Sequence, residues 1–130
     1  ALRAQHFVAL VGLGYHLASP ARQSEWEAAL VAHNLLLRGG EVGRVENANF
    51  DARRGFVWSC IEWRAASKAS RGRAWAVVWI CKIKDQSASN KRQPVVVCQR
   101  RAGVIDDPMC AYSALITRWM RVIGYLPWAG

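Results

Sequence analysis

Apolar residues recur at helical spacing in the first third of the chain. Trp26, Leu37 and apolar residues between them fall along one face of a helix. Ser24 is followed three residues later by Glu27, which fits a capping box, and two consecutive glycines provide a stop. The pattern predicts a helix over residues 24–38.

The middle of the chain changes to short runs rich in Val, Ile and Trp, which favour β-strands. The runs are GFVWSCIEW, AWAVVWICKI and PVVVC, at residues 55–63, 74–83 and 94–98. A basic loop, RAASKASRGR, separates the first two, and a polar turn, KDQSASNKRQ, separates the second from the third. We therefore predict three short strands.

Helical spacing returns in DDPMCAYSALITRWMRVIGY, where Asp106 or Asp107 would cap the helix and Pro108 would lie in its first turn. The order of elements predicts an α+β fold, with helices packed beside a small three-stranded antiparallel sheet. We expect helix 24–38 to pack against the helix that begins near Asp107.

A length of 130 residues suits a single domain or part of one, and 52% apolar residues argue against disorder. The longest apolar stretch, residues 7–18, is shorter than the roughly 20 residues that span a bilayer. We interpret it as a core segment and do not expect a transmembrane protein. Four tryptophans of the strands are expected to pack in the core or on a face of the sheet: Trp58, Trp63, Trp75 and Trp79.

The four cysteines contain no Cys-x-x-Cys pair, so a zinc site has little support and we expect neither a metal nor a cofactor. Three of them lie among apolar residues, where a free cysteine behaves as a small hydrophobic residue. We therefore favour buried, reduced thiols over disulfides for Cys60, Cys81, Cys98 and Cys110.

The net charge of +9 favours an anionic partner, with nucleic acid first and an acidic membrane surface second. Residues 71–101 hold eight cations and one acid, a net charge of +7. Contact with phosphates is the better interpretation of this concentration, although a solvated basic face remains the alternative. The cations are Arg71, Arg73, Lys82, Lys84, Lys91, Arg92, Arg100 and Arg101.

Three segments occur in an order that resembles the first half of the catalytic domain of tyrosine recombinases, the phage-type integrases. In AALVAHNLLLRGGEVGRV, a helix ends near Arg38, and Glu41 follows. In WICKIKDQSASNKRQPVVV, a strand is followed by Lys84, a polar turn and another strand. DDPMCAYSALITRW resembles the next helix of the family. The resemblance covers residues 22–121 and is closest to recombinases of DIRS-like and Crypton-like mobile elements.

The resemblance implies roles for three residues in cleaving a DNA phosphodiester. Arg38 would donate two parallel hydrogen bonds to the oxygens of the pentacoordinate phosphorane, and Glu41 would fix its orientation. Lys84 would protonate the departing sugar oxygen, with Lys82, two residues away on the same strand face, as the competing candidate. The implied activity is DNA recombination and integration, without a metal or cofactor.

The resemblance also implies duplex DNA as the partner, bound through its phosphate backbone, and a nuclear location. The residues expected to contact nucleic acid are Arg71, Arg73, Lys82, Lys91 and Arg92.

The chain departs from the family in lacking the second catalytic box, because none of its histidines has an arginine three positions later. Tyr112 and Tyr125 come too early in the order of motifs to be the nucleophile, and Tyr15 precedes all of them. We therefore expect residues 1–130 to be a single partial domain that binds DNA but cannot cleave it alone.

A second hypothesis keeps the fold but changes the role. Both ends of the chain, HFVALVGLGYHLA and VIGYLPWAG, are apolar, as if they packed on another molecule. The chain would then be a repurposed, non-catalytic structural subunit that contacts other protein subunits of a larger, membrane-associated assembly. Its location would be an organelle, reached after removal of a targeting segment.

Overall fold

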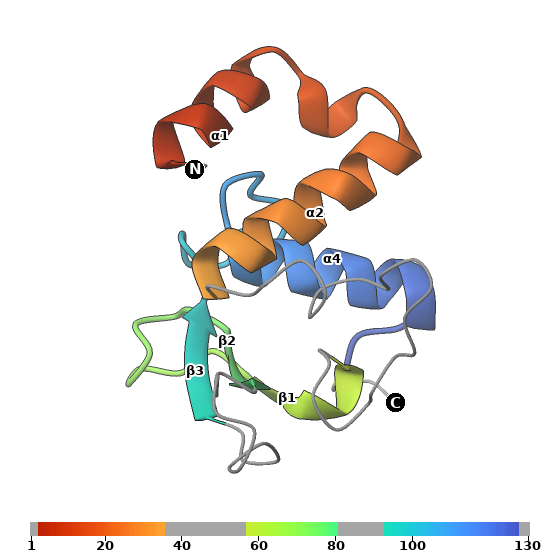
Figure 1. The fold of residues 1–130 in the computed structure, drawn as a ribbon. Helices are drawn as coiled ribbons and strands as arrows, with labels where there is room; N and C mark the ends of the chain where they lie inside the picture. Colours follow the sequence, from red (N-terminus) through yellow and green to blue (C-terminus); the bar gives the residue numbers. More distant parts are fainter. Residues whose placement is uncertain (1–2, 36–56, 81–92, 128–130) are drawn as a thin grey trace, which may run out of the picture.

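The computed structural model describes residues 3–35, 57–80 and 93–127. Within these ranges, α-helices and a three-stranded antiparallel sheet form the predicted α+β fold (Figure 1). In chain order the elements are α1 (Ala4–Gly12), the 3-10 turn η1 (Tyr15–Leu17), α2 (Pro20–Leu35), the 3-10 turn η2 (Trp58–Cys60), β1 (Ile61–Arg64), β2 (Trp75–Ile80), β3 (Gln93–Cys98) and α4 (Ala111–Ile123).

Helix α2 begins four residues before the predicted start. The backbone N–H of Arg22 donates to Ser19 Oγ at 3.1 Å, and Pro20 occupies the first helical position. A serine cap followed by proline is a favourable way to begin a helix, because proline has no N–H to leave unpaired. The predicted capping box of Ser24 and Glu27 is therefore wrong, and Glu27 is a buried residue of the helix.

Helix α4 also begins without the predicted aspartate cap. Its N-cap residue is Cys110, which makes no side-chain capping bond. Asp107 accepts the backbone N–H of Met109 at 3.0 Å, so its carboxylate stabilises the turn that precedes the helix. The helix ends at Ile123 and is capped by Gly124, which has a φ of 96° and can adopt this left-handed conformation without steric strain.

The strands follow the order β1-β2-β3, with Val78 paired to both Ile61 and Val95. Burial alternates along β2: Ala76, Val78 and Ile80 are buried, and the residues between them are partly exposed. This alternation is typical of a sheet covered on one face.

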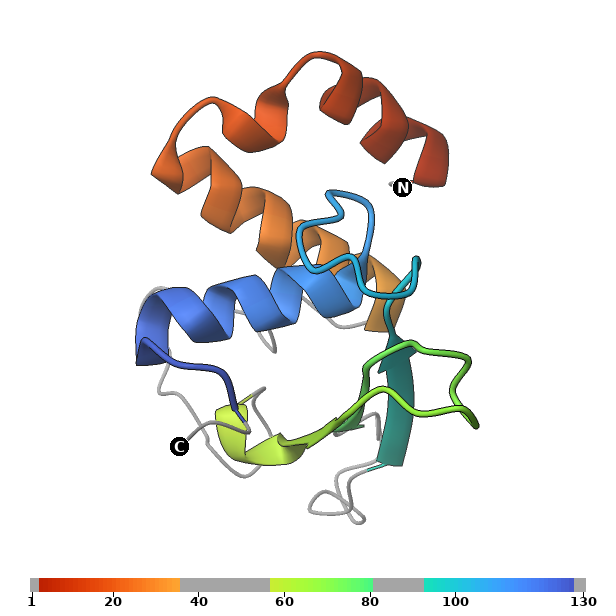
Figure 2. The same ribbon diagram turned by 180° about the vertical axis from the view of Figure 1, so that it is seen from behind.

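Helix α4 lies between α2 and the sheet, as both views show (Figure 1, Figure 2). Residues 111–116 are all buried, which a helix packed on one side could not achieve. The predicted packing of α2 against α4 is confirmed, and Trp26 Nε1 donates at 2.8 Å to the carbonyl of Pro108 in the loop that precedes α4. The core is therefore centred on α4.

Aromatic rings from η2 and β1 extend the core against α4. The ring centroids of Trp58 and Trp119 lie 5.3 Å apart, and those of Trp63 and Tyr112 lie 5.9 Å apart, both edge to face. These contacts confirm the predicted packing role of Trp58 and Trp63.

The N-terminal apolar stretch is less buried than a core segment would be. Phe7 is buried against Trp26, but Val8, Leu13 and Leu17 are 60%, 83% and 77% exposed. The stretch lies on the far side of α2 from the sheet, so only one of its faces meets the core (Figure 1). Across the described ranges, no helix is long and apolar enough to cross a membrane.

Cys98 and Cys110 are free thiols. Cys60 and Cys110 are buried as predicted, but Cys98 is exposed, because it lies at the end of an edge strand. Cys81 lies outside the described residues.

Candidate functional site

Two loops leave the sheet at the same end. Arg64 at the end of β1 pairs with Trp75 at the start of β2, and Trp75 pairs with Cys98 at the end of β3. The loop of residues 65–74 and the loop of residues 99–110 therefore start beside each other.

Gln99 joins these two loops. Its side chain is buried, and its amide oxygen accepts the backbone N–H groups of Ala74 at 2.9 Å and Gly103 at 3.2 Å. Its own backbone N–H donates to the carbonyl of Ala74 at 2.9 Å. A Cβ atom added to Gly72 would lie 3.7 Å from the Cβ of Ala102, so the loops are also in van der Waals range. One buried amide thus holds both loops in a single arrangement.

The first loop is also held by its own hydrogen bonds. The backbone N–H of Ser67 donates to Ser70 Oγ at 2.9 Å, and the N–H of Gly72 donates to the carbonyl of Ser67 at 2.9 Å. Arg71 has a φ of 56°, a left-handed conformation that is unfavourable for a residue with a Cβ. The loop therefore presents the exposed side chains of Arg71 and Arg73 from a constrained backbone.

The second loop carries two arginines that share one buried carboxylate. Arg100 Nε lies 2.8 Å from Asp107 Oδ2, and Arg101 Nε lies 3.2 Å from the same oxygen. Burial alone would raise the pKa of Asp107, but the hydrogen bonds from Arg100, Met109 and Arg101 outweigh burial and lower it. The side chains of Arg100 and Arg101 remain 54% and 59% exposed, so their outer faces are open to solvent.

We call this group of cations the basic sheet end. It brings together two predicted nucleic-acid contacts, Arg71 and Arg73, with Arg100 and Arg101, which the sequence counted among the cations that favour phosphate contact, and with Lys68, to which the sequence assigned no role. Lys68 had a weak signal, since it lies in a loop that was already recognised as basic. The complete set is Lys68, Arg71, Arg73, Arg100 and Arg101.

The other predicted site residues lie outside the described residues: Arg38, Glu41, Lys82, Lys84, Lys91 and Arg92. The described chain stops at Ile80 and resumes at Gln93, and these two residues pair at the opposite end of β2 from Trp75. Ile80 and Gln93 are therefore separated from the basic sheet end by the length of β2.

A second charged cluster lies where α2 crosses α4. Glu27 is buried, and Arg121 donates to both of its carboxylate oxygens, with Nη1 at 3.1 Å. Arg118 Nε lies 3.5 Å from Glu27 Oε1. Hydrogen bonding to Glu27 raises the pKa of Arg121 above its ordinary value, so this guanidinium stays charged.

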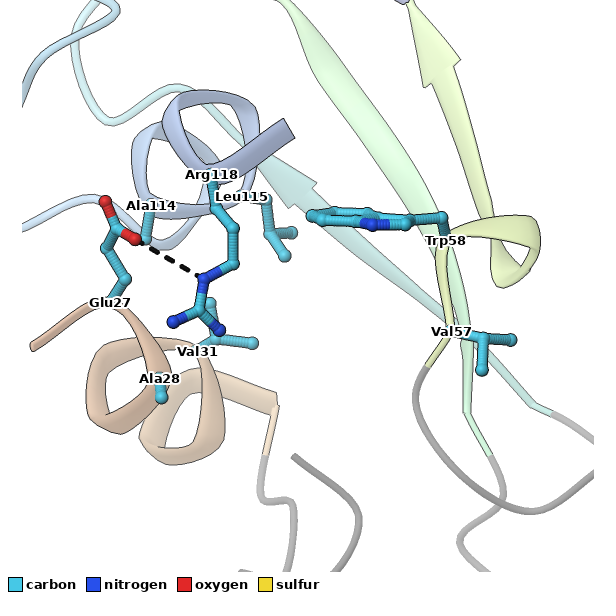
Figure 3. A pocket seen from close by; sticks show the side chains of 8 residues that line it. All are labelled: Glu27, Ala28, Val31, Val57, Trp58, Ala114, Leu115 and Arg118. Atoms are coloured by element: carbon cyan, nitrogen blue, oxygen red, sulfur yellow. Dashed lines mark ion pairs between the residues drawn. The ribbon is translucent and has the colours of Figure 1, made fainter. Parts of the chain in front are cut away.

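A pocket of about 300 Å³ opens beside this cluster (Figure 3). Glu27 and Arg118 lie along one side of it, and the indole of Trp58 lies across from them. The remaining wall is apolar and consists of Ala28, Val31, Val57, Ala114 and Leu115.

The tyrosine within α4, Tyr112, is not positioned to act as a nucleophile. Tyr112 is 1% exposed, and burial raises the pKa of its hydroxyl to about 12. A phenol in this environment is a poor nucleophile at neutral pH, because almost none of it is ionised. Among the described residues, no group of three or more His, Cys, Asp or Glu side chains could hold a metal ion.

Comparison of the chain with models of known protein families, with curated proteins and with solved structures found no match.

Proposed function

We propose that this chain binds the phosphate backbone of duplex DNA through the basic sheet end. In this proposal it is a fragment similar to the first half of a tyrosine recombinase catalytic domain, and it does not cleave DNA alone. The observation that carries the proposal is the convergence of five cations from two separate loops at one end of the sheet.

Two features favour phosphate as the partner. The loops are held by Gln99 and by the serine bonds of the first loop, so less conformational entropy is lost when an anion binds. Asp107 neutralises part of the charge from the buried side, while the guanidinium groups of Arg100 and Arg101 remain exposed. Contacts of this kind neutralise phosphates and release counterions without reading the base sequence.

A salt titration of DNA binding tests the proposal. The logarithm of the binding constant should fall linearly with the logarithm of salt concentration, by about 0.9 per phosphate contact. Arg71→Gln combined with Arg73→Gln should lower this slope by about two if each arginine meets one phosphate. The change should be similar for unrelated duplex sequences, and fluorescence anisotropy with a labelled duplex would measure it.

Arg22→Glu is the matched control, because it lowers the net charge by the same two units, one positive charge lost and one negative charge gained. Arg22 is exposed at the start of α2, in a different layer from the sheet (Figure 1). If the control lowers the slope as much as the double variant, net charge alone governs binding and the basic sheet end is not the interface.

The absence of cleavage is tested separately by covalent trapping on a suicide duplex substrate. We expect no protein–DNA adduct, since Tyr112 is buried and the sequence has no His-x-x-Arg box. An adduct that maps to any tyrosine would contradict this part of the proposal and leave the binding part intact.

One observation favours the alternative of a structural subunit. Val8, Leu13 and Leu17 are large apolar side chains of the first 17 residues that remain mostly exposed. If the chain is a structural subunit, Leu13→Ser with Leu17→Ser should abolish its incorporation into a larger assembly without changing the salt slope for DNA. If DNA binding is the function, the same double variant should behave as the unaltered chain does in the titration.

A further inference from the structure

The pocket beside Glu27 has an uneven charge. One carboxylate faces two guanidinium groups, which leaves a net charge of +1 in a partly buried position. The two arginines are 31% and 37% exposed, so water screens this excess less than it would on an open surface. An anion in the pocket would remove the imbalance.

The two arginines differ in how many of their N–H donors make hydrogen bonds. Arg121 donates through both terminal nitrogens to Glu27, in the two-pronged geometry that satisfies a carboxylate best. Arg118 makes only the longer contact from Nε and a bond from Nη2 to the carbonyl of Ser24 at 3.0 Å. Its Nη1 has no hydrogen-bond acceptor among the described residues.

Arg118 is also the arginine that lines the pocket, whereas Arg121 does not. Figure 3 places its guanidinium between Glu27 and the apolar side of the pocket. The group with spare donors therefore faces the space that a ligand would occupy.

The rest of the pocket defines the body of that ligand. Trp58 offers an aromatic surface, and the apolar wall, which includes Val31 and Leu115, has no charged group. A volume of about 300 Å³ is at the small end of the range of ligand pockets, which is roughly 300–1,000 Å³.

We propose that this pocket binds a small amphipathic anion. A carboxylate or phosphate monoester head would accept hydrogen bonds from Arg118, and a short apolar body would pack against Trp58 and Leu115. This inference does not depend on the proposed DNA binding, because neither Arg118 nor Trp58 belongs to the basic sheet end.

Hexanoate, hexyl phosphate and hexan-1-ol test the proposal, since they share one apolar chain and differ in the head. Each would be titrated into the full chain while two-dimensional NMR follows the indole N–H signals, with Trp58→Phe used to identify the signal of Trp58. We expect at least one of the two anions to shift the Trp58 signal and to bind at least tenfold more tightly than hexan-1-ol. The tighter of the two anions identifies the preferred head group. If hexan-1-ol binds as well as both anions, or if neither anion shifts the signal, the proposal is wrong.

Arg118→Gln and Arg121→Gln form a matched pair, because each removes one charge from the same cluster. Arg118→Gln should weaken binding of the preferred anion about tenfold or more and leave the affinity for hexan-1-ol unchanged. Arg121→Gln should change the affinity for the preferred anion less than threefold. Equal effects of the two variants would overturn the assignment of Arg118.

If Arg118→Gln fails to fold, Ala28→Leu gives an independent test. Ala28 lines the pocket from α2, and leucine is a good helix former that would fill the space. The variant should fold and lose anion binding. Binding that survives in this variant would place the ligand elsewhere and contradict the proposal.

Discussion

Two buried acids, Asp107 and Glu27, are each held by a pair of arginines, yet the two clusters serve different parts of the molecule. Asp107 binds arginines six and seven residues away in the same loop. Glu27 on α2 binds Arg121, which is 94 residues away on α4. The first cluster shapes a loop, and the second joins two helices.

The arginine side chains of the two clusters also differ in how much of their surface is exposed to solvent. In the loop cluster Arg100 and Arg101 are 54% and 59% exposed, so the buried acid positions cations that still face solvent. In the helix cluster Arg118 and Arg121 are 31% and 37% exposed and border a pocket or lie between helices. A cluster of one acid and two arginines can therefore hold cations at the surface or join two helices, depending on where the backbone brings the three side chains together.

The largest effect is expected for Asp107→Asn. The side chain of Asp107 has no exposed surface, and it accepts bonds from two guanidinium groups and one backbone N–H. The change loses or weakens three charge-assisted hydrogen bonds at a fully buried carboxylate, but water partly screens the half-exposed arginines, so we expect a total loss of about 3 kcal/mol in the free energy of unfolding. Urea denaturation followed by circular dichroism would measure it. The control Asp106→Asn alters the exposed neighbour and should leave the midpoint almost unchanged.

Glu27→Gln should have a somewhat smaller effect. The side chain of Glu27 is 6% exposed, whereas that of Asp107 has no exposed surface, and within the described ranges Glu27 accepts bonds from arginine side chains but not from a backbone N–H. We expect a loss of about 2 kcal/mol in the same denaturation experiment. Glu25→Gln is the control, because Glu25 forms an exposed pair with Arg22, and its removal should not shift the midpoint. A loss for Glu27→Gln as small as that of the control would mean that the helix cluster contributes nothing to stability.

The smallest effect is a pH dependence that belongs to the loop cluster. Because the pKa of Asp107 is lowered from its ordinary value of 3.8, its stabilisation is present above that value and is lost as the pH falls through the folded-state pKa. The difference in free energy of unfolding between the unaltered chain and Asp107→Asn should therefore be constant from pH 7 to pH 5. It should shrink below about pH 4. A difference that already shrinks between pH 7 and pH 5 would show that another group controls the cluster.

Local patterns predicted the types of most elements, but in the run at 55–63 residues 58–60 form the 3-10 turn η2 and β1 begins only at Ile61. The run at 74–83 contains β2, the run at 94–98 is β3 with one further residue, and helical spacing marked both α2 and α4. These elements were predictable because the period of apolar residues and the preference of β-branched residues for strands act within a few residues of chain.

The ends of the helices were harder to predict, because a capping motif is only a few residues long and recurs by chance. Ser24 and Glu27 match the motif, but the chain starts the helix earlier at Ser19 and Pro20. Asp107 resembles a cap, but the two preceding arginines and the turn at Met109 bind its carboxylate instead.

The sequence by itself determined the α+β class, the order of the elements and the concentration of cations between residues 71 and 101. Only the tertiary structure decided which charges meet. It set Arg71 and Arg73 beside Arg100 and Arg101 at one end of the sheet, and it buried Glu27 against an arginine 94 residues away. Spacing along the chain could not reveal these contacts, because electrostatic pairing depends on distance through space, and that distance follows from how the whole chain buries its apolar surface.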